Sequence, residues 1–397
     1  MSSSVTLTAA TRQNLLSLQD TAALTATTQN RLSTGLKVSS ALDNPVSFFT
    51  SQSLSQRSGD LGNLLDGISN GIQAIQAANQ GITSIQKLVD QAKSVANQAL
   101  STQITTTGTA STKYSAPAAD TTLNLFVNGV ATTAALTSTG TIDDAISSLN
   151  SAVGAGSFSK STDGTKIVMN ASADVEFKTS TDQTALGFKG GTNASGVTYD
   201  TTTAASQSTD LTVSGVSARA TLAAQYNSLL TQIDQLASDA SFNGTNLIRG
   251  KGDNNDLTIN FNPKGNSNLQ VTATDETSAG LKLNAIGNKS AGTTTAGQGF
   301  FLLNDDINTT LDSLTSASSQ LRTDASTFGS NLSVVQNRQD FSKNLINILD
   351  TGSSNLTAAD LNQEAANSQA LSTRQSLGIS ALSLANQAQQ GILQLLR

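Results

Sequence analysis

Apolar side chains recur with a heptad spacing over a long segment in the first quarter of the chain. The steps alternate between four and three residues through Leu61, Leu65, Ile68, Ile72, Ile75, Asn79 and Ile82. This spacing places the side chains along one face of an α-helix and is typical of coiled-coil packing. Asn44 followed by Pro45 fits a helix cap and a first helical residue. The pattern therefore predicts a helix from about residue 45 to about residue 100.

Two further stripes supply partners for this helix. One runs from Ile307 to Leu349 with the same alternation of four and three residues, and a shorter one runs from Leu222 to Leu236. The long helix needs such partners, because it contains five glycines and each costs up to about 1 kcal/mol relative to alanine. We expect a helical bundle whose core includes Leu61, Leu65, Ile68, Ile72, Ile75, Ile82, Leu311, Leu314, Leu321, Phe328, Leu332 and Val335.

Both ends of the chain are apolar but carry little charge. No charged residue lies between Arg374 and Arg397, and two adjacent helical stripes give this segment a wide apolar face. Thr357 and Asp360 have the spacing of a capping box that would open it. A wide apolar face with an uncharged rim is typical of a surface buried against other protein. The predicted contact residues are Leu7, Leu15, Leu18, Leu32, Leu36, Leu371, Leu377, Leu382, Leu384, Ile392, Leu395 and Leu396.

The middle of the chain has β character. Residues 123–130 (LNLFVNGV) read as a strand that enters an Asn-Gly turn, and residues 157–169 alternate around an Asp-Gly turn. Helical spacing over residues 141–150 lies between them, so we expect a small ββαββ unit. A second hairpin is predicted over residues 257–273, and a Gly/Thr-rich linker over residues 287–298. The predicted fold class is α+β, an elongated helical coiled-coil bundle with a β-rich insertion.

Composition excludes several functions. The chain has no His and no Cys, which rules out a Ser-His-Asp triad, an HExxH metal site, Cys-ligated zinc and disulfides. The adjacent acids Asp143–Asp144 and Asp305–Asp306 are candidates for paired carboxylates, but adjacent residues point apart on a helix and are more typical of helix starts. We therefore expect a structural protein without cofactor or metal.

Charge and hydropathy limit the partners. A net charge of −6 argues against nucleic-acid binding. No run of about 18 apolar residues is present, so membrane insertion is not expected. The first residues lack a basic stretch followed by an apolar block, so a cleaved signal peptide is not expected either.

Several motifs resemble the bacterial flagellin family. Residues 31–43 (RLSTGLKVSSALD) are similar to the family's "RLSSGLRINSAxDD" stretch, and residues 241–248 (SFNGTNLI) to its "FNGxxLL" turn. Residues 335–338 (VQNR) and 385–397 (ANQAQQGILQLLR) match its C-terminal pattern, "ANQxPQxxLxLL". These motifs occur in the family's order at both ends of the chain.

The resemblance implies a division into five segments. Residues 1–42 and 351–397 form an inner coiled coil, residues 43–102 and 217–350 form the helical bundle, and residues 103–216 form an inserted, surface-exposed β-rich domain. It implies a subunit that polymerises into the extracellular filament of the bacterial flagellum for swimming motility, with ends that fold and bury each other on assembly. A hook–filament junction protein or another secreted axial or adhesive protein is the alternative.

The resemblance also implies partners and a location. These are other copies of the chain, the flagellar cap and hook-junction proteins, and an export chaperone at the C-terminal region, with secretion through the flagellum's own type III channel. O-linked glycans on the Ser/Thr-rich middle and an ordinary soluble surface there both stay open. An innate immune receptor recognises the pattern "QRxRELAxQ" in the family, and the matching positions Gln86, Lys87, Val89, Asp90 and Gln91 are degenerate here. We therefore expect weak or no recognition by this receptor, because Lys or Val does not replace an Arg fork.

Overall fold

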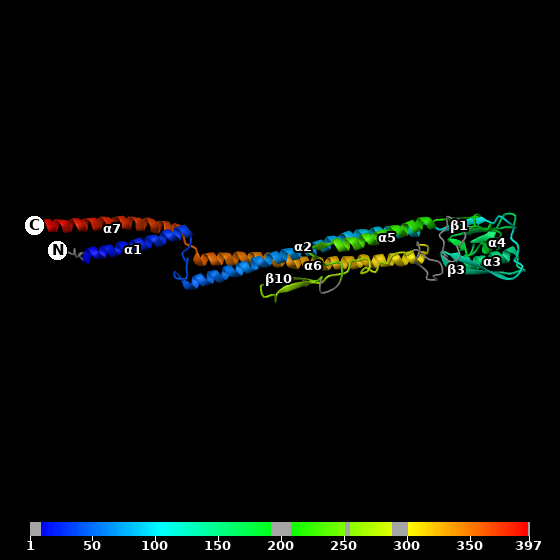
Figure 1. Ribbon diagram of the computed structural model, residues 1–397, viewed down its shortest axis with the longest axis horizontal. Coiled ribbons are helices and arrows are strands. Elements are labelled where there is room, and N and C mark those ends of the chain that lie inside the picture. Colours follow the sequence, from blue (N-terminus) through cyan, green and yellow to red (C-terminus); the bar gives the residue numbers. More distant parts are fainter. Residues whose placement is uncertain (1–8, 192–207, 251–254, 288–300, 396–397) are drawn as a thin grey trace. The chain divides into compact units, whose positions relative to one another are not determined.

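A computed structural model describes residues 9–191, 208–250, 255–287 and 301–395 of the chain (Figure 1). By its internal contacts the chain forms two compact units. Unit 1 contains residues 1–69, 260–268 and 336–397, and unit 2 contains residues 70–259 and 269–335. The long helices are α1 (Ala9–Thr34), α2 (Pro45–Ser101), α5 (Val216–Asp239), α6 (Asn304–Thr357) and α7 (Leu361–Leu395). None of the described helices combines the length and the hydropathy that a membrane span needs.

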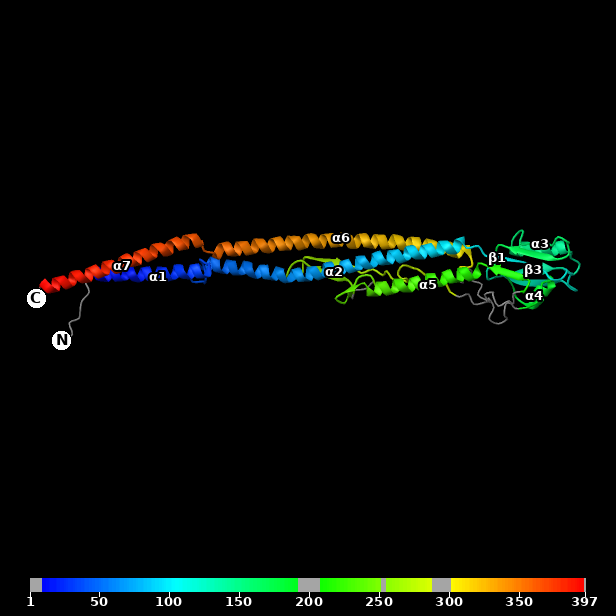
Figure 2. The same cartoon turned by 90° about the horizontal axis from the view of Figure 1, so that it is seen from above.

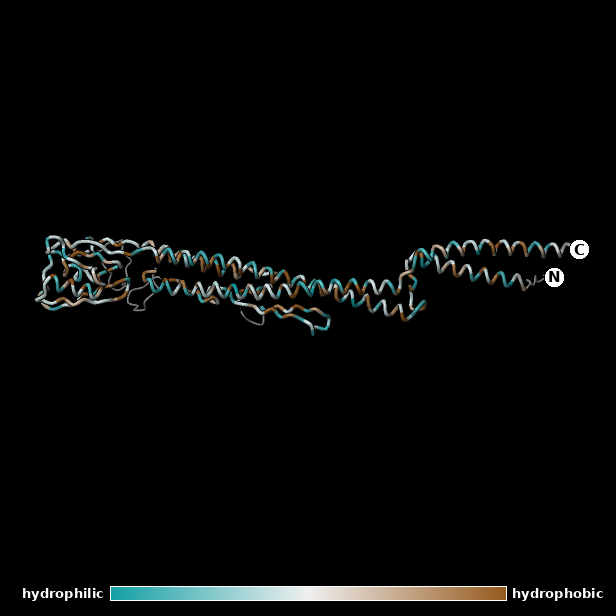
Figure 3. The backbone as a smooth tube through the Cα atoms, turned by 180° about the vertical axis from the view of Figure 1, so that it is seen from behind, coloured by the Kyte–Doolittle hydropathy of each residue, from teal (hydrophilic) through white to brown (hydrophobic). Residues whose placement is uncertain are grey.

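The predicted long helices are confirmed. Helix α2 begins at Pro45 and ends one residue beyond the predicted end. Asn44 caps it, because its Oδ1 accepts a hydrogen bond from the amide of Ser47 at 3.1 Å. Helices α5 and α6 contain the two other predicted stripes. Apolar and polar residues alternate along each of these helices (Figure 3), as the period of a helix with one covered side requires.

Helix α5, α2 from residue 70 onward and α6 up to residue 335 form the helical part of unit 2, where α5 lies beside the other two helices (Figures 1 and 2). Of the predicted core positions in the two units, nine are buried: Leu61, Ile68, Ile72, Ile75, Ile82, Leu314, Leu321, Phe328 and Val335. Leu65, Leu311 and Leu332 are half-buried. Helix α5 adds Leu222, Tyr226, Leu230 and Ile233 to the core of unit 2. The last turns of α2 bury Ala92, Ala96 and Ala99 completely.

Glycines of α2 have two different surroundings. A Cβ built on Gly81 would lie 2.6 Å from the Cβ of Ala240 and 2.7 Å from Cδ1 of Ile248. A Cβ on Gly71 would lie 2.5 Å from Cδ1 of Ile259. These two glycines therefore let the segment that follows α5 approach the helix closely. A Cβ on Gly59, Gly62 or Gly67 meets nothing within 4 Å.

The β-rich part of unit 2 contains two antiparallel sheets. One has the strand order β4-β5-β1-β7 and the other the order β3-β2-β6. The bounds are β1 (Thr105–Thr109), β2 (Thr121–Val127), β3 (Val130–Leu136), β4 (Phe158–Lys160), β5 (Ile167–Ala171), β6 (Val175–Phe177) and β7 (Leu211–Ser214). Helices α3 (Ile142–Val153) and α4 (Ser180–Ala185) complete this part. The predicted ββαββ order is confirmed by β2, β3, α3, β4 and β5, but its two hairpins belong to different sheets.

The predicted turns have the expected geometry. Asn128 and Gly129 join β2 to β3 with φ angles of 50° and 79°, and two positive φ angles define the turn that fits a two-residue hairpin. The second predicted hairpin consists of β10 (Leu257–Asn260) and β11 (Asn268–Val271). The short strands β8 (Ser241–Phe242) and β9 (Thr245–Asn246) flank the Asn243–Gly244 turn. The predicted linker lies almost wholly outside the described residues.

One sequence prediction is wrong. Thr357 does not cap the C-terminal segment, because it is the last residue of α6 and its hydroxyl donates to the carbonyl of Ser353 at 3.1 Å. Asp360 is the cap of α7, and its Oδ1 accepts hydrogen bonds from the amides of Asn362 and Gln363. The residue types of a capping box are present, but the turn of α6 already uses the hydroxyl.

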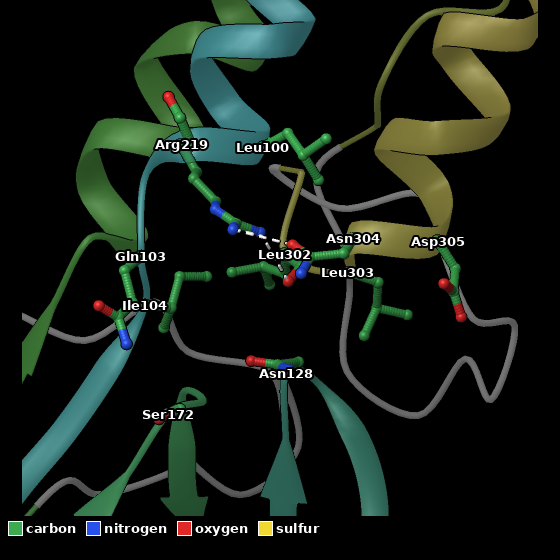
Figure 4. Close-up of a pocket in the computed structure, with 11 residues that line it drawn as sticks. Leu100, Gln103, Ile104, Asn128, Ser172, Arg219, Leu302, Leu303, Asn304 and Asp305 are labelled. Atoms are coloured by element: carbon green, nitrogen blue, oxygen red, sulfur yellow. Dashed lines mark hydrogen bonds between the residues drawn. The ribbon is translucent and has the colours of Figure 1, made fainter.

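Arg219 joins three segments where the helices of unit 2 meet its β-rich part. Its guanidinium donates to the carbonyls of Thr102 and Phe301 at 2.8 and 3.0 Å. It also donates to the carbonyl of Leu302 and to Oδ1 of Asn304 at 3.2 and 2.9 Å (Figure 4). The side chain is buried. Thr102 directly follows α2, and the other acceptors lie just before α6 or at its first residue. Arg219 itself lies in the first turn of α5, so one side chain links the ends of three helices. A cavity of about 410 Å³ lies beside it.

We expect Gly81→Ala to destabilise the chain and Gly59→Ala to stabilise it. The new methyl group at position 81 meets Ala240 and Ile248, and overpacking of this kind costs about 1–3 kcal/mol. At position 59 the methyl group is unobstructed, and alanine gains about 0.5–1 kcal/mol over glycine in a helix. Urea unfolding of the monomer measures both effects. Equal effects of the two substitutions would contradict the packing described for α2.

We expect Arg219→Gln to lower the free energy of unfolding by on the order of 3 kcal/mol, because buried acceptors then lose a charged donor. Arg322→Gln is the matched control. The guanidinium of Arg322 bonds only within α6 among the contacts described, to the carbonyl and hydroxyl of Ser318, so the loss there is expected to stay below about 1 kcal/mol. Thermal unfolding followed by circular dichroism compares the two variants, and similar losses would contradict the role of Arg219.

Candidate functional site

Helices α1 and α7 of unit 1 lie side by side (Figures 1 and 2). A short backbone joint fastens them where α1 ends and α7 begins. The amide of Lys37 donates to the carbonyl of Thr357 at 2.7 Å, and the amide of Ala359 donates to the carbonyl of Gly35 at 2.9 Å. Arg31 adds an ion pair, in which its Nη1 lies 3.1 Å from Oε1 of Glu364. The joint fixes the register of the two helices.

The seam between α1 and α7 is lined largely by small and polar side chains. On α1 the buried or half-buried residues are Thr11, Asn14, Leu18, Thr21, Thr25, Thr28, Arg31 and Leu32. On α7 they are Glu364, Ser368, Leu371, Gln375, Gly378, Leu382 and Ala385. Leu18 lies directly over Gly378, where an added Cβ would be 3.1 Å from its Cγ. The hydroxyls of Thr21 and Thr25 bond to carbonyls of their own helix, so mainly their methyl groups pack in the seam.

Large apolar side chains of the same helices point away from the seam. Leu377 and Leu384 are 66% and 69% exposed. Leu15, Leu16, Leu24 and Ile379 are also exposed. Of the two predicted stripes of the C-terminal segment, one therefore faces α1 and the other lies open. Of the predicted contact residues, Leu18, Leu32, Leu371 and Leu382 are half-buried, and Leu36 is exposed beside the joint. Ile392 and Leu395 fall in α7, and Leu7 and Leu396 lie outside the described residues.

Sequence reasoning missed the threonine seam. It followed leucines along the N-terminal segment and passed over threonine as polar. The seam residues of α1 from Thr11 to Leu32, Arg31 aside, nevertheless follow steps of three and four without a break. This regular spacing could have identified the seam if threonine had been counted as a residue that can be buried, because a buried threonine presents a methyl group to its neighbour.

The positions that match the immune-receptor pattern are only partly accessible. Val89 is 0% exposed and belongs to the core of unit 2. Gln86 is half-buried, and its Nε2 donates to the hydroxyl of Ser318 and to Oδ1 of Asp90. Lys87, Asp90 and Gln91 are exposed. The five matched positions of α2 therefore contain one cation, Lys87, and no arginine.

The two pairs of adjacent acids lie at helix starts. Asp144 forms a capping box with Thr141, and hydrogen bonds from that residue hold the pKa of its carboxyl below the ordinary value. Asp143 forms an ion pair with Lys160 at 2.7 Å. Asp305 and Asp306 lie in the first turn of α6, where the positive end of the helix dipole stabilises a carboxylate. Within the described ranges, no group of three or more acidic side chains is arranged to hold a metal ion.

Two family models match the chain. The bacterial flagellin N-terminal helical region matches residues 5–135, and the bacterial flagellin C-terminal helical region matches residues 311–396. Together they cover more than half of the chain. The first match contains α1, α2 and the hairpin of β2 and β3 almost to its end, and the second contains most of α6 and α7. The FNGTNLI turn lies outside both matches.

Curated relatives are similar over a smaller share. Flagellin FljM of Caulobacter vibrioides is 36% identical over 172 residues, which are 43% of this chain and 58% of the relative. A flagellin of Brucella melitensis is 27% identical over 44% of this chain and 60% of its own length. Flagellin C of Rhizobium meliloti is 40% identical over 19% of this chain and 24% of its own. The chain thus spans about three fifths of the first relatives it matches. With both helical regions present in order and helices α1, α2, α6 and α7 within them, the chain belongs to the bacterial flagellin family.

Proposed function

We propose that the chain is a structural subunit that polymerises into the extracellular helical filament of the bacterial flagellum and serves swimming motility. The observation that carries this proposal is the open leucine face of α1 and α7. A helix pair whose seam contains mainly threonines and other small or polar residues, with most of its leucines exposed, gains little from its own seam. Covering each exposed leucine is worth about 1.5–3 kcal/mol, and a second copy of the chain offers the same face.

Exposed apolar residues gather in the unit that contains these helices. Among the described residues, every large exposed apolar side chain except Val334 belongs to unit 1. Phe49 on α2 and Phe341 and Ile348 on α6 are exposed as well as the leucines of the terminal helices. Exposed patches of this kind mark protein–protein contacts. Contacts that repeat from copy to copy without closing generate a helical filament.

In this proposal different segments of the chain have different roles in the filament. Residues 1–42 and 351–397 form the inner coiled coil, residues 43–102 and 217–350 the bundle, and residues 103–216 an outward domain. The terminal helices order and bury each other during assembly. A hook–filament junction protein, or another secreted axial or adhesive protein, is the second candidate, because terminal helices with open apolar faces suit these proteins as well.

The proposed partners follow from this role. They are other copies of the chain, the cap and hook-junction proteins at the two ends of the filament, and an export chaperone that holds the C-terminal region before secretion. The chain reaches the outside through the flagellum's own export channel. Its role is structural, without a cofactor.

We expect the double variant Leu377→Asn, Leu384→Asn to fold as a monomer but to lose filament growth. Both side chains are exposed in the single chain, so each substitution is expected to change the free energy of unfolding by less than about 0.5 kcal/mol. Assembly of purified monomer is followed by light scattering and electron microscopy. Growth of long filaments by the unchanged chain favours a filament subunit over a junction protein.

The matched control replaces Ser376 and Ser383 with Asn, one residue away on the same turns of α7. This variant is expected to assemble like the unchanged chain. Normal growth of the leucine variant would refute the assembly role of the open face. Amide exchange of α1 and α7, measured in monomer and polymer, tests ordering on assembly, and equal protection in both states speaks against it.

We also expect the polymer-forming chain to activate the innate flagellin receptor weakly or not at all. Val89 is buried, and Gln86 is bonded to Ser318, so the arginines of the recognised pattern have no counterpart at the matched positions of α2. A receptor reporter assay against a strongly stimulating flagellin measures the difference. Equal potency of the two proteins contradicts the expectation.

A further inference from the structure

Residues 274–286 form a segment that follows the β10–β11 hairpin in unit 2. Backbone hydrogen bonds pair its start with the segment after β9, since the amide of Thr274 donates to the carbonyl of Leu247 at 2.8 Å and the amide of Glu276 to that of Ile248 at 2.9 Å. Farther on, the amide of Ser278 donates to Oδ1 of Asp234 on α5 at 2.7 Å. The segment is thus fastened on one side to α5.

On its other side the segment meets α6 through two carboxyl groups. Glu276 is 0% exposed and Asp324 of α6 is 9% exposed. Among the described residues no donor reaches either carboxyl oxygen of Glu276, and Nε2 of Gln320 donates to Oδ2 of Asp324 at 2.7 Å. Asp324 and the two residues that precede Glu276 line the same cavity. Ionised carboxylates only accept hydrogen bonds. An ionised Glu276 would therefore be buried without a partner, whereas a protonated Glu276 carries a hydroxyl that can donate to Asp324.

The surroundings favour the protonated form of the pair. Burial, and then the hydrogen bond with Asp324, raise the pKa of Glu276 from its ordinary value of 4.5 to about 8, and the charge of Asp275 acts in the same direction. A cavity of about 860 Å³ beside the pair is lined by three acids and one cation: Asp275, Asp312, Asp324 and Lys282. Further charged groups on the elements around the pair include Asp234 of α5 and Arg322 of α6. They also include Arg249, whose backbone pairs with that of Asp275.

We propose that Glu276 and Asp324 form a proton-dependent latch, which fastens residues 274–286 to α6 while the pair shares a proton and loosens as the pH rises. The latch acts within one chain and does not depend on filament assembly. It operates beside the cavity, through which water reaches the carboxyl groups once the segment loosens.

The sign of the pH dependence follows from the two states of the latch. In the open state Glu276 is exposed to water and ionises near 4.5, whereas in the closed state it keeps its proton up to about pH 8. Closure is therefore strongest below pH 4.5 and weakens by up to about tenfold per pH unit between these two values. Above about pH 8 both states are ionised, and closure no longer changes.

Carboxyl labelling tests the proton directly, because the chain contains only three glutamates, Glu176, Glu276 and Glu364. In monomer labelled with ¹³C at the glutamate carboxyl carbon, we expect one of three signals to titrate near pH 8. This signal disappears in Glu276→Gln and persists in the control Glu364→Gln. Titration of all three signals below pH 6 overturns the proposal.

Amide exchange tests the release of the segment. The protection of the amides of Glu276 and Ile286, corrected for intrinsic exchange, is expected to fall by about tenfold per unit between pH 5 and pH 8 in the unchanged chain. Glu276→Gln keeps a donor for Asp324 and is expected to show flat protection, while Glu364→Gln keeps the slope. The same slope in Glu276→Gln overturns the latch.

Asp324→Asn provides a second variant if Glu276→Gln does not fold. It leaves Glu276 a neutral amide as its partner, so the fall in protection is expected to end at a lower pH than in the unchanged chain. An unchanged pH range in Asp324→Asn overturns the proposal, because the shared proton then has no part in closure.

Discussion

A helix as long as α2, with five glycines along it, is stable in water only where another surface covers its apolar side. In unit 2 that cover is extensive. The segment after α5 approaches α2 so closely that Gly71 and Gly81 have no room for a side chain. In unit 1 the cover is partial, and Phe49, Phe341 and Ile348 stay exposed. The part of the molecule with an incomplete cover is therefore the part that we assign to contacts with other copies.

The same constraint explains the terminal helices. A seam of threonines holds α1 and α7 in register, but it offers methyl groups where a stable coiled coil uses leucine or isoleucine. Leu18, Leu32, Leu371 and Leu382 are half-buried in the seam, but Leu15, Leu16, Leu24, Leu377 and Leu384 lie outside it, where a single chain does not cover them. Pairing within the chain and pairing between chains thus draw on different faces of the same two helices, so one does not compete with the other.

Heptad spacing located α2, α5 and α6 because helices that pack along their length repeat their buried positions at a fixed period. A different local signal, strand-like runs on either side of Asn-Gly or Asp-Gly, predicted the hairpins β2–β3 and β4–β5. It could not find β1, because Thr105–Thr109 shows no alternation of polarity. The cap of α7 was misplaced, since a pattern of residue types does not show that Thr357 is already bonded in α6. Glu276 and Asp324 meet only through tertiary packing, which no local pattern records.

The shortage of charge along α7 has a consequence for the environment in which copies can associate. Attraction between surface charges decays within about 10 Å at 0.1 M salt and within about 3 Å at 1 M, whereas apolar burial does not weaken when salt is added. Between Arg374 and Arg397 the chain has no charge to be screened. Contacts built on this stretch keep their strength from dilute fresh water to brine, which suits the extracellular polymer that we propose.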